Sequence, residues 1–391
     1  MGALCAWRCG SNRLNCPTLF FPPLDHWIWL VPVFCIGACI GSFLNVVIYR
    51  VPLGMSVNDP KRSFCPQCKK PIPVWLNLPL VSWLWLRGKC AACGKRIAFR
   101  YFGVEFLTAL LFVAAWRLFP PQVVVFLWVM MALLVAITFI DAEHLMIPTG
   151  LTWAGAATGL CAGAAWPQLP AMAGVPGNWL SGLTHSGSGW LAGFVGLWVV
   201  VELGKLAFGK KTLNFETPVN WHLKEPEGEQ DPMCFVIGGE EIAWWDMFTR
   251  KSDRLSVAAT DILVDGESVG GGKLVIGEMQ IVLPDGTVRH LTKMKSLAGM
   301  ASSAVVPREA MGSGDVHLLG MIGAFCGWTG VFYSLFAASI FAVIAAVIGR
   351  IGFGKQLPFG PFLAMGAVTW LFGGWKLWAW YLDFLGPLWM P

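Results

Sequence analysis

Two aspartates lie at the ends of apolar segments, where carboxylates are rare. Asp141 closes the apolar run I-T-F-I-D, and Asp315 opens another run directly behind M-G-S-G. An ionisable group is costly in hydrocarbon, so an acid at this depth indicates a function. Two carboxyl groups that share a water can serve as general base and general acid without a cofactor, and they titrate as a coupled pair. Asp141 and Asp315 are therefore our candidate catalytic residues.

Two glycines precede the second aspartate. Gly312 and Gly314 lack a Cβ, so the backbone can bend there and a peptide substrate can approach it closely. We predict that both contact substrate. The structural alternative is that Gly-Ser-Gly is only a loop and that Asp315 is an N-cap, which accepts from free backbone N–H groups at the start of a helix.

Four cysteines form a second pattern. C-P-Q-C at 65–68 and C-A-A-C at 90–93 are separated by 21 residues. Paired knuckles at this spacing are typical of a tetrahedral zinc site, to which each knuckle gives two thiolates. Two disulfides or four free thiols are the alternatives, and a cytoplasmic location argues against disulfides. Four thiolates leave no open coordination position, so the predicted role of Cys65, Cys68, Cys90 and Cys93 is structural.

The elements around these residues are apolar. Of 391 residues, 56% are hydrophobic and 13% are charged, and the mean hydropathy is +0.61, which indicates an integral membrane protein. Runs long enough to cross the hydrocarbon core predict about eight helices. They lie near 27–49, 103–119, 122–140, 150–166, 189–208, 316–331, 332–349 and 361–381. Pro120-Pro121 and the stretch Gly327 to Gly330 divide two of the longest runs into hairpins.

Charge in the loops sets the orientation. The loop 50–100 carries ten Lys or Arg and one acid, Asp59, whereas the loop 167–188 has no Lys or Arg. Positive loops stay in the cytoplasm, so the cysteine loop faces inward. The net charge of +5 reflects these inner loops and is no sign of nucleic-acid binding.

One segment departs from the membrane pattern. Residues 209–305 hold nearly half of the charged residues, and Asp265-Gly266 and Asp285-Gly286 separate alternating apolar runs. Asp-Gly between such runs predicts β-hairpins. We therefore expect a small β-rich cytoplasmic insert.

The predicted fold is an all-α polytopic membrane protein with a cytoplasmic four-cysteine zinc-type loop and a β-rich soluble insert. The predicted segments are a tail (1–26), the first transmembrane helix (27–49), the zinc-binding loop (50–102), transmembrane helices 2–5 with the first aspartate (103–208), the insert (209–305), and the G-S-G-D motif with helices 6–8 (306–391).

Several ordered blocks make the chain similar to a known family. They are G-S-F-L-N-V-V-I-Y-R-V-P at 41–52, the two cysteine knuckles, R-Y-F-G-V-E-F-L-T-A-L-L-F at 100–112, R-E-A-M-G-S-G-D-V-H-L-L-G-M-I-G-A-F at 308–325 and L-P-F-G-P-F-L-A-M-G-A at 357–367. The chain resembles the type IV prepilin peptidases, bacterial membrane aspartyl proteases of the GxGD type. Where relatives commonly carry Lys after the motif, this chain has His317, which weakens the cationic bias on Asp315.

The resemblance implies that Asp141 and Asp315 are the catalytic pair and that the protein resides in the bacterial inner membrane. It implies prepilin or pseudopilin precursors of the type IV pilus and type II secretion systems as substrates, in contact with membrane lipid and with no nucleic acid. Many relatives also methylate the new N-terminus with S-adenosylmethionine, here through residues 41–52 and the loop beyond. Asn45 in that block could equally form a helix–helix hydrogen bond. Glu105 is expected to bind the basic leader or to stabilise Arg100.

Alternatives of other classes remain at this point. The protein could be a peptidase without methyltransferase activity. A proton-coupled transporter would use the two aspartates as a relay. A membrane scaffold would use the zinc loop and the insert to dock pilus or secretion machinery.

Overall fold

The computed structural model describes residues 26–167, 178–208, 210–225, 233–248, 253–307, 312–349 and 357–389. The chain forms two compact units, the first comprising residues 1–190 and 320–391 and the second residues 191–319. The predicted N-terminal tail lies almost wholly outside the described residues.

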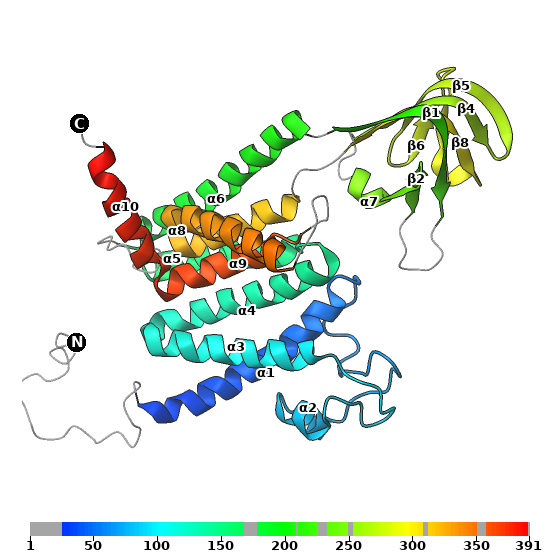
Figure 1. The fold of residues 1–391 in the computed structure, drawn as a ribbon. Helices are drawn as coiled ribbons and strands as arrows, with labels where there is room; N and C mark the ends of the chain where they lie inside the picture. Colours follow the sequence, from blue (N-terminus) through cyan, green and yellow to red (C-terminus); the bar gives the residue numbers. More distant parts are fainter. Residues whose placement is uncertain are drawn as a thin grey trace, which may run out of the picture. The chain divides into compact units, whose positions relative to one another are not determined.

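Long apolar helices make up most of the first unit (Figure 1). They are α1 (Leu30–Arg50), α3 (Phe99–Leu118), α4 (Pro121–His144), α5 (Thr149–Ala165), α9 (Gly360–Thr369) and α10 (Trp375–Trp389). The cysteine loop adds the 3-10 turn Val74–Leu76 and the short helix α2 (Val81–Trp85), and the 3-10 turn Trp27–Trp29 precedes α1. Helices α6 (Trp179–Phe208) and α8 (Ser313–Ile348) each contain residues of both units.

Helix α4 is the core element of the first unit. It contacts α1, α3, α5 and α9, and it is the most buried of the candidate membrane spans. Pro121 occupies its first turn, where the missing N–H would have no helical partner anyway. It ends at Leu145, a left-handed residue with φ 52° whose N–H donates to the carbonyl of Asp141. The last turn of the core helix therefore carries Asp141.

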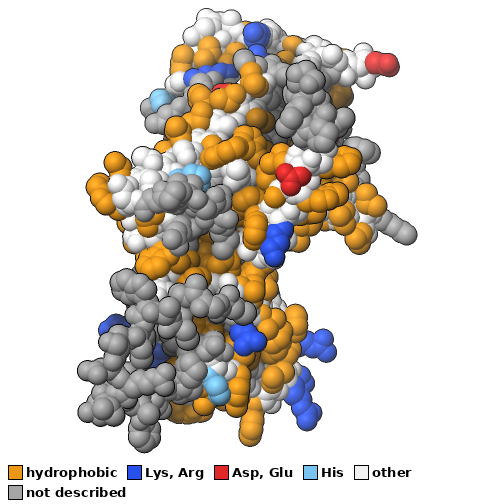
Figure 2. Space-filling view, turned by 90° about the vertical axis from the view of Figure 1, so that its left-hand side faces the viewer, with side chains coloured by type: hydrophobic (Ala, Val, Ile, Leu, Met, Phe, Trp, Pro, Cys, Tyr) orange, Lys and Arg blue, Asp and Glu red, His pale blue; other side chains and the backbone are white. Residues whose placement is uncertain are grey.

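Five helices in the described residues are long and apolar enough to cross a membrane. They are Trp27–Arg50, Phe99–Leu118, Pro121–His144, Trp179–Lys205 and Ser313–Ile348. Figure 2 shows one face of the molecule, on which hydrophobic side chains dominate and charged ones are scattered, as lipid contact requires. The prediction of a helical membrane protein is confirmed, whereas the count of eight spans is not.

The hairpin break predicted in the stretch Gly327 to Gly330 exists. Gly327 has φ 68° and ψ 177°, which no α-helix allows, so α8 consists of two helices joined there. A Cβ on Gly323 would lie 2.8 Å from Val331 Cγ2. Residues eight apart in one straight helix are separated by about 12 Å. The chain therefore doubles back at Gly327, the first residue of the predicted stretch, so the sixth helix ends a few residues before its predicted bound of 331.

The last predicted span, 361–381, is not one straight helix. A π-type turn, Trp370–Gly374, separates α9 from α10, and Gly373 within it has φ 124°. The hydropathy of the sequence shows only that both halves are apolar. It does not reveal a change of backbone direction inside an apolar run.

Two glycines bring α1 against α3. A Cβ on Gly37 would lie 2.7 Å from Ala109 Cα, and a Cβ on Gly41 would lie 2.6 Å from Glu105 Cα. Gly37 and Gly41 form a G-x-x-x-G pattern, which lets two membrane helices approach at the backbone. This close approach places the first turns of α3 beside the end of α1.

The second unit contains an eight-stranded antiparallel sheet in the order β3-β2-β1-β8-β4-β5-β6-β7. The strands are β1 (Lys210–Lys224), β2 (Cys234–Ile237), β3 (Glu240–Ala243), β4 (Leu255–Val264), β5 (Glu267–Ile276), β6 (Gln280–Val282), β7 (Val288–His290) and β8 (Leu297–Pro307), with the short helix α7 (Trp244–Met247) and the 3-10 turn Leu291–Lys293. The predicted β-rich insert is confirmed. Strands β1, β2, β3 and β8 were not predicted, because the prediction covered only the runs that flank the two Asp-Gly pairs.

Both Asp-Gly pairs lie where the hairpin prediction put them. Asp265 (φ 52°) and Gly266 (φ 87°) join β4 to β5, and Asp285-Gly286 lies between β6 and β7. Asp265 Oδ1 also accepts from the N–H groups of Lys295 and Ser296, which lowers the pKa of this carboxyl. The first and last strands are neighbours, with Lys210 opposite Pro307, so both ends of the insert lie side by side.

Candidate functional site

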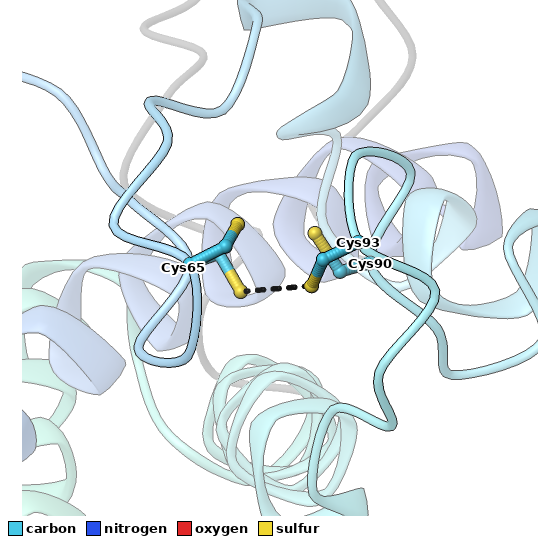
Figure 3. Close-up of side chains that lie close together, drawn as sticks. Cys65, Cys90 and Cys93 are labelled. Atoms are coloured by element: carbon cyan, nitrogen blue, oxygen red, sulfur yellow. Dashed lines mark hydrogen bonds between the residues drawn. The ribbon is translucent and has the colours of Figure 1, made fainter.

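The four predicted metal ligands lie together. The Sγ atoms of Cys65, Cys68, Cys90 and Cys93 are all within 4.8 Å of one another. Figure 3 shows Cys65 facing Cys93 across the two knuckles, with their sulfurs 4.0 Å apart. Zinc–thiolate bonds of about 2.3 Å in a tetrahedron place the sulfurs about 3.8 Å apart. The cluster can therefore hold a metal ion such as zinc with little movement.

The two knuckles have the same backbone geometry. Cys65 N–H donates to the carbonyl of Lys70, and Cys90 N–H donates to the carbonyl of Lys95. Lys69 N–H and Gly94 N–H each donate back to the first cysteine of their knuckle, and both residues are left-handed, with φ 57° and 69°. This repetition is what two equivalent ligand pairs around one ion require.

Charge in the cluster also favours a cation. The backbone amides of Cys93 and Ala92 hydrogen-bond to the Cys90 thiol and lower its pKa to about 7. The backbone amide of Lys95 also favours the Cys93 thiolate, but desolvation and the neighbouring thiols outweigh it and raise the pKa of Cys93 to about 11. Four thiols this close ionise together only when a cation neutralises them.

A pocket of about 530 Å³ lies between α1, the cysteine loop and the start of α3. This volume is in the range of small-molecule and cofactor sites. Aromatic side chains and a few polar groups line it. The polar and aromatic lining residues include Ser42, Asn45, Tyr49, Trp83, Tyr101 and Glu105.

Glu105 contributes the carboxylate of this pocket. The residue is 9% exposed, and its Oε2 accepts from Leu80 N–H at 2.7 Å. Arg100, the partner suggested for it by the sequence, instead forms an ion pair with Glu143 at 2.8 Å. That suggestion was wrong because the start of α3, with Arg100, lies beside the end of α4, with Glu143.

Two buried polar atoms in the pocket lack a hydrogen-bond partner among the described residues. Asn45 Nδ2 donates to the carbonyl of Tyr101 at 2.9 Å, which confirms the helix–helix bond, but Asn45 Oδ1 has no donor. Trp83 Nε1 has no acceptor. Buried polar groups are nearly always paired, so such orphans point to a ligand or water.

Arg50 organises the wall of the pocket. It is 3% exposed, and its guanidinium donates to the carbonyls of Ser56, Val57, Pro60 and Arg62 at 2.9–3.3 Å. Five donors in a fixed fork can bind several carbonyls at once, which an ammonium does less well. One side chain at the end of α1 thus fixes the loop that follows.

Asp141 has a partner that sequence reasoning missed. The residue is 5% exposed, and its Oδ2 accepts from Gly360 N–H, the first residue of α9, at 3.0 Å. A Cβ at position 360 would lie 2.7 Å from that oxygen and 3.1 Å from Ile147 Cδ1. Only glycine allows this approach. The block L-P-F-G-P-F contained Gly360, but nothing in the sequence joined it to an aspartate 219 residues away.

Asp315 is 7% exposed and lies in the first turn of α8. Its N–H donates to the carbonyl of Gly312, so the residue lies inside the helix and is not the N-cap of the structural alternative. A negative side chain in the first turn interacts favourably with the helix dipole. Two residues on, the His317 ring packs edge-on against Phe194.

The substrate contacts of Gly312 and Gly314 stay a prediction. Neither Gly312 nor Gly314 is among the glycines with positive φ in the described residues. Among the described residues, a Cβ on Gly312 would have one neighbour within 4 Å, Asp315 Oδ2 at 4.0 Å. Asp141 belongs to the first unit and Asp315 to the second, so their meeting stays a prediction.

Comparison with known proteins decides the family. Residues 35–119 match the bacterial peptidase A24 N-terminal domain, and residues 283–347 match the type IV leader peptidase family. A prepilin leader peptidase/N-methyltransferase of Aeromonas hydrophila is 35% identical over 221 residues, 48% of this chain and 69% of the relative. The chain belongs to the prepilin leader peptidase/N-methyltransferase family.

Other relatives bear the same name. The one from Myxococcus xanthus is 44% identical over 142 residues, 36% of this chain and 41% of the relative. The one from Neisseria gonorrhoeae is 34% identical over 203 residues, 45% of this chain and 65% of the relative. The chain therefore spans less than two thirds of these two prepilin peptidases. No solved structure matches it.

The two regions that match family models contain different parts of the candidate site. The region that matches the A24 N-terminal domain contains the pocket and the four cysteines, and the other matched region contains Asp315. Asp141 and Gly360 lie outside both matched stretches, so their association comes from the coordinates alone.

Proposed function

We propose that this protein is a membrane aspartyl endopeptidase that removes the leader from prepilin or pseudopilin precursors and then methylates the new N-terminus. Family membership supports this over the transporter and scaffold alternatives. We further propose the bacterial inner membrane as its location, with eight crossings when the broken and short helices are counted.

For cleavage, Asp141 and Asp315 are proposed to act as a pair. One carboxylate takes a proton from water while the other carboxylic acid protonates the scissile carbonyl oxygen, and the tetrahedral intermediate collapses to two products. The observation that carries this proposal is the buried Asp141, held by the Gly360 amide at the end of the core helix. That amide fixes one carboxylate oxygen and leaves the other for chemistry.

The few neighbours of Gly312 among the described residues support a peptide that lies next to Asp315. A substrate strand that passes there would present its carbonyl to the carboxyl group one helical turn on. Gly312 and Gly314 are proposed to contact this strand.

For methylation, the acceptor groups and aromatic side chains of the pocket near α1 suit both reactants. The Glu105 carboxylate and the orphan Asn45 Oδ1 are acceptors, and Tyr49 and Tyr101 add aromatic surface. Acceptors and aromatic faces together favour cations. The new N-terminus is an amine, and S-adenosylmethionine, which supplies the methyl group, is a sulfonium. Glu105 would orient the amine and accept its proton.

The four-cysteine cluster is proposed to hold structural zinc. Two of its cysteines, Cys65 and Cys90, also line the pocket, so the ion would fix the pocket wall from behind. Four protein thiolates leave the ion no position for substrate.

The test uses purified protein in lipid nanodiscs, a prepilin with its hydrophobic stem, and S-adenosylmethionine. Mass spectrometry should show loss of the leader and then the mass of one added methyl group. Cleavage without methylation would restrict the function to a peptidase, and intact substrate would refute the proposal.

A further inference from the structure

The segment between the two cysteine knuckles is unusual for a loop. Residues 74–86 read V-W-L-N-L-P-L-V-S-W-L-W-L and contain no charged residue. Trp75 is 73% exposed and Trp85 is 82% exposed. Such a density of exposed large apolar side chains marks an interaction surface and is not expected of a loop that faces only water.

The exposure follows the helical period. In α2, Val81, Leu84 and Trp85 share one face, at positions i, i+3 and i+4, and all three are exposed. Ser82 and Trp83 point the other way and line the pocket. The helix is therefore anchored by its inner side and presents an apolar outer side.

The surface continues onto a membrane helix. The Trp83 ring contacts those of Phe99 and Phe102, and Phe102 stacks on Phe106, with ring centroids 5.2–5.9 Å apart. Phe99 and Phe106 are exposed on α3, a candidate membrane span. The aromatic row thus leads from the segment along the face of a helix that meets lipid.

Charge complements this apolar surface at both ends. Lys69 and Lys70 precede the segment, Arg87 and Lys89 follow it, and all four are exposed. Tryptophans flanked by basic side chains are typical of segments that lie in the interface of an anionic membrane. A partner protein would explain the apolar residues but not their continuity with α3.

We propose that residues 74–86 insert into the headgroup region of an anionic leaflet. Because Leu78, Trp83 and Leu86 line the pocket, its rim then lies at the membrane surface. A hydrophobic stem that stays in the bilayer could bring its amino end to the pocket without leaving lipid. This consequence alone rests on the proposed function; the insertion does not.

The test is photo-crosslinking in nanodiscs made with anionic lipid, part of which carries a carbene-forming group in its acyl chain near the headgroup. Peptides that contain residues 74–86 should carry lipid adducts, as should the exposed face of α3, whereas β4 and β5 should carry none. Adducts on α3 without adducts on 74–86 would overturn the proposal, and so would protein–protein crosslinks at 74–86 in their place.

A paired variant sharpens this result. Trp75→Ser with Trp85→Ser should reduce the adducts on this segment several-fold, while metal content stays unchanged. Trp380→Ser, which removes a 63% exposed tryptophan of α10, is the matched control and should leave them unaltered. Equal labelling in the double variant and the control would contradict insertion through these side chains. The readout needs no enzymatic activity, so it stands even if the proposed function fails.

Discussion

Glu105 and Asp141 are both buried carboxylates. Each accepts a hydrogen bond from the backbone N–H of a residue in another part of the chain, but the backbone conformations of the two donor residues differ. Asp141 accepts from the N–H of Gly360, which lies at the start of a regular helix and has no left-handed backbone torsion. Glu105 receives the amide of Leu80, whose φ of 63° and ψ of −49° are rare for a leucine.

Leu80 is the centre of a tight turn in which Val81 N–H donates to the carbonyl of Pro79 at 2.6 Å. A three-residue turn with positive φ is strained and persists only where its surroundings hold it. The pocket carboxylate therefore holds a strained loop in place, whereas the carboxylate of the core helix is itself held by rigid neighbours. The first arrangement suits a site that adapts to ligands, and the second suits a fixed catalytic acid or base.

The largest effect is expected at the rigid site. Asp141→Asn keeps the size of the side chain and an acceptor for Gly360, but it removes proton transfer, so leader cleavage should fall about 10²- to 10⁴-fold or more. Cleavage is measured by mass spectrometry, with membrane insertion and metal content as controls. A normal cleavage rate would exclude Asp141 from the chemistry. Asp315→Asn should behave in the same way.

The next variant tests whether cleavage depends on the fixed position of the Asp141 carboxylate. Gly360→Ala would place a methyl group 2.7 Å from Asp141 Oδ2, so the carboxylate must shift and cleavage should drop about 10²-fold. Gly150→Ala is the matched control, because a Cβ there meets nothing within 4 Å. Similar cleavage rates for both variants would show that the hydrogen bond from Gly360 N–H to Asp141 does not contribute to catalysis.

Loss of the metal should impair methylation at the pocket that contains Glu105 and leave leader cleavage nearly unchanged. Cys90→Ser removes one thiolate of the cluster, so metal content should fall and methylation should drop more than tenfold as the pocket wall loosens. Cleavage should stay within a few-fold of wild type. Elemental analysis and product masses check both. Equal losses of the two activities would mean that the cluster supports the whole protein.

Glu105→Gln gives a milder separation of the two activities. The amide oxygen can still accept from Leu80, so the loop stays in place, but the group no longer takes a proton. Methylation should fall about tenfold at constant cleavage. Rates are followed with a precleaved peptide, so that methylation is measured without the first step. A parallel fall in cleavage would indicate leader binding instead.

The smallest effect concerns the strained turn itself. Leu80→Gly relieves the strain of the positive φ, so the folded loop should become more stable by about 1 kcal/mol or less. The gain is small because glycine loses more backbone entropy on folding than leucine does. Hydrogen exchange of residues 76–90 measures this. Leu78→Gly, at an exposed position whose φ is not positive, should lose stability. If both variants lose stability, the torsion at Leu80 is not strained.

The sequence predicted what depends on local spacing. Two Cys-x-x-Cys knuckles specify a tetrahedral site because each knuckle fixes its own pair of ligands, and the Asp-Gly hairpins are equally local. The partners of the carboxylates were missed because Leu80 and Gly360 act through backbone amides, which leave no side-chain signal. The break at Gly327 was predicted from the glycines there, whereas the break at Gly373 was missed because an apolar run has the same hydropathy whether it bends or not.

The pairing of the first and last strands of the sheet bears on how this protein could be re-engineered. Lys210 and Pro307 face each other across a single strand spacing, about 4.8 Å. A module attached through two adjacent points can be spliced in or cut out with only a short connector left behind. The sheet could thus be exchanged for a reporter domain at the same junction without moving the helices that flank it.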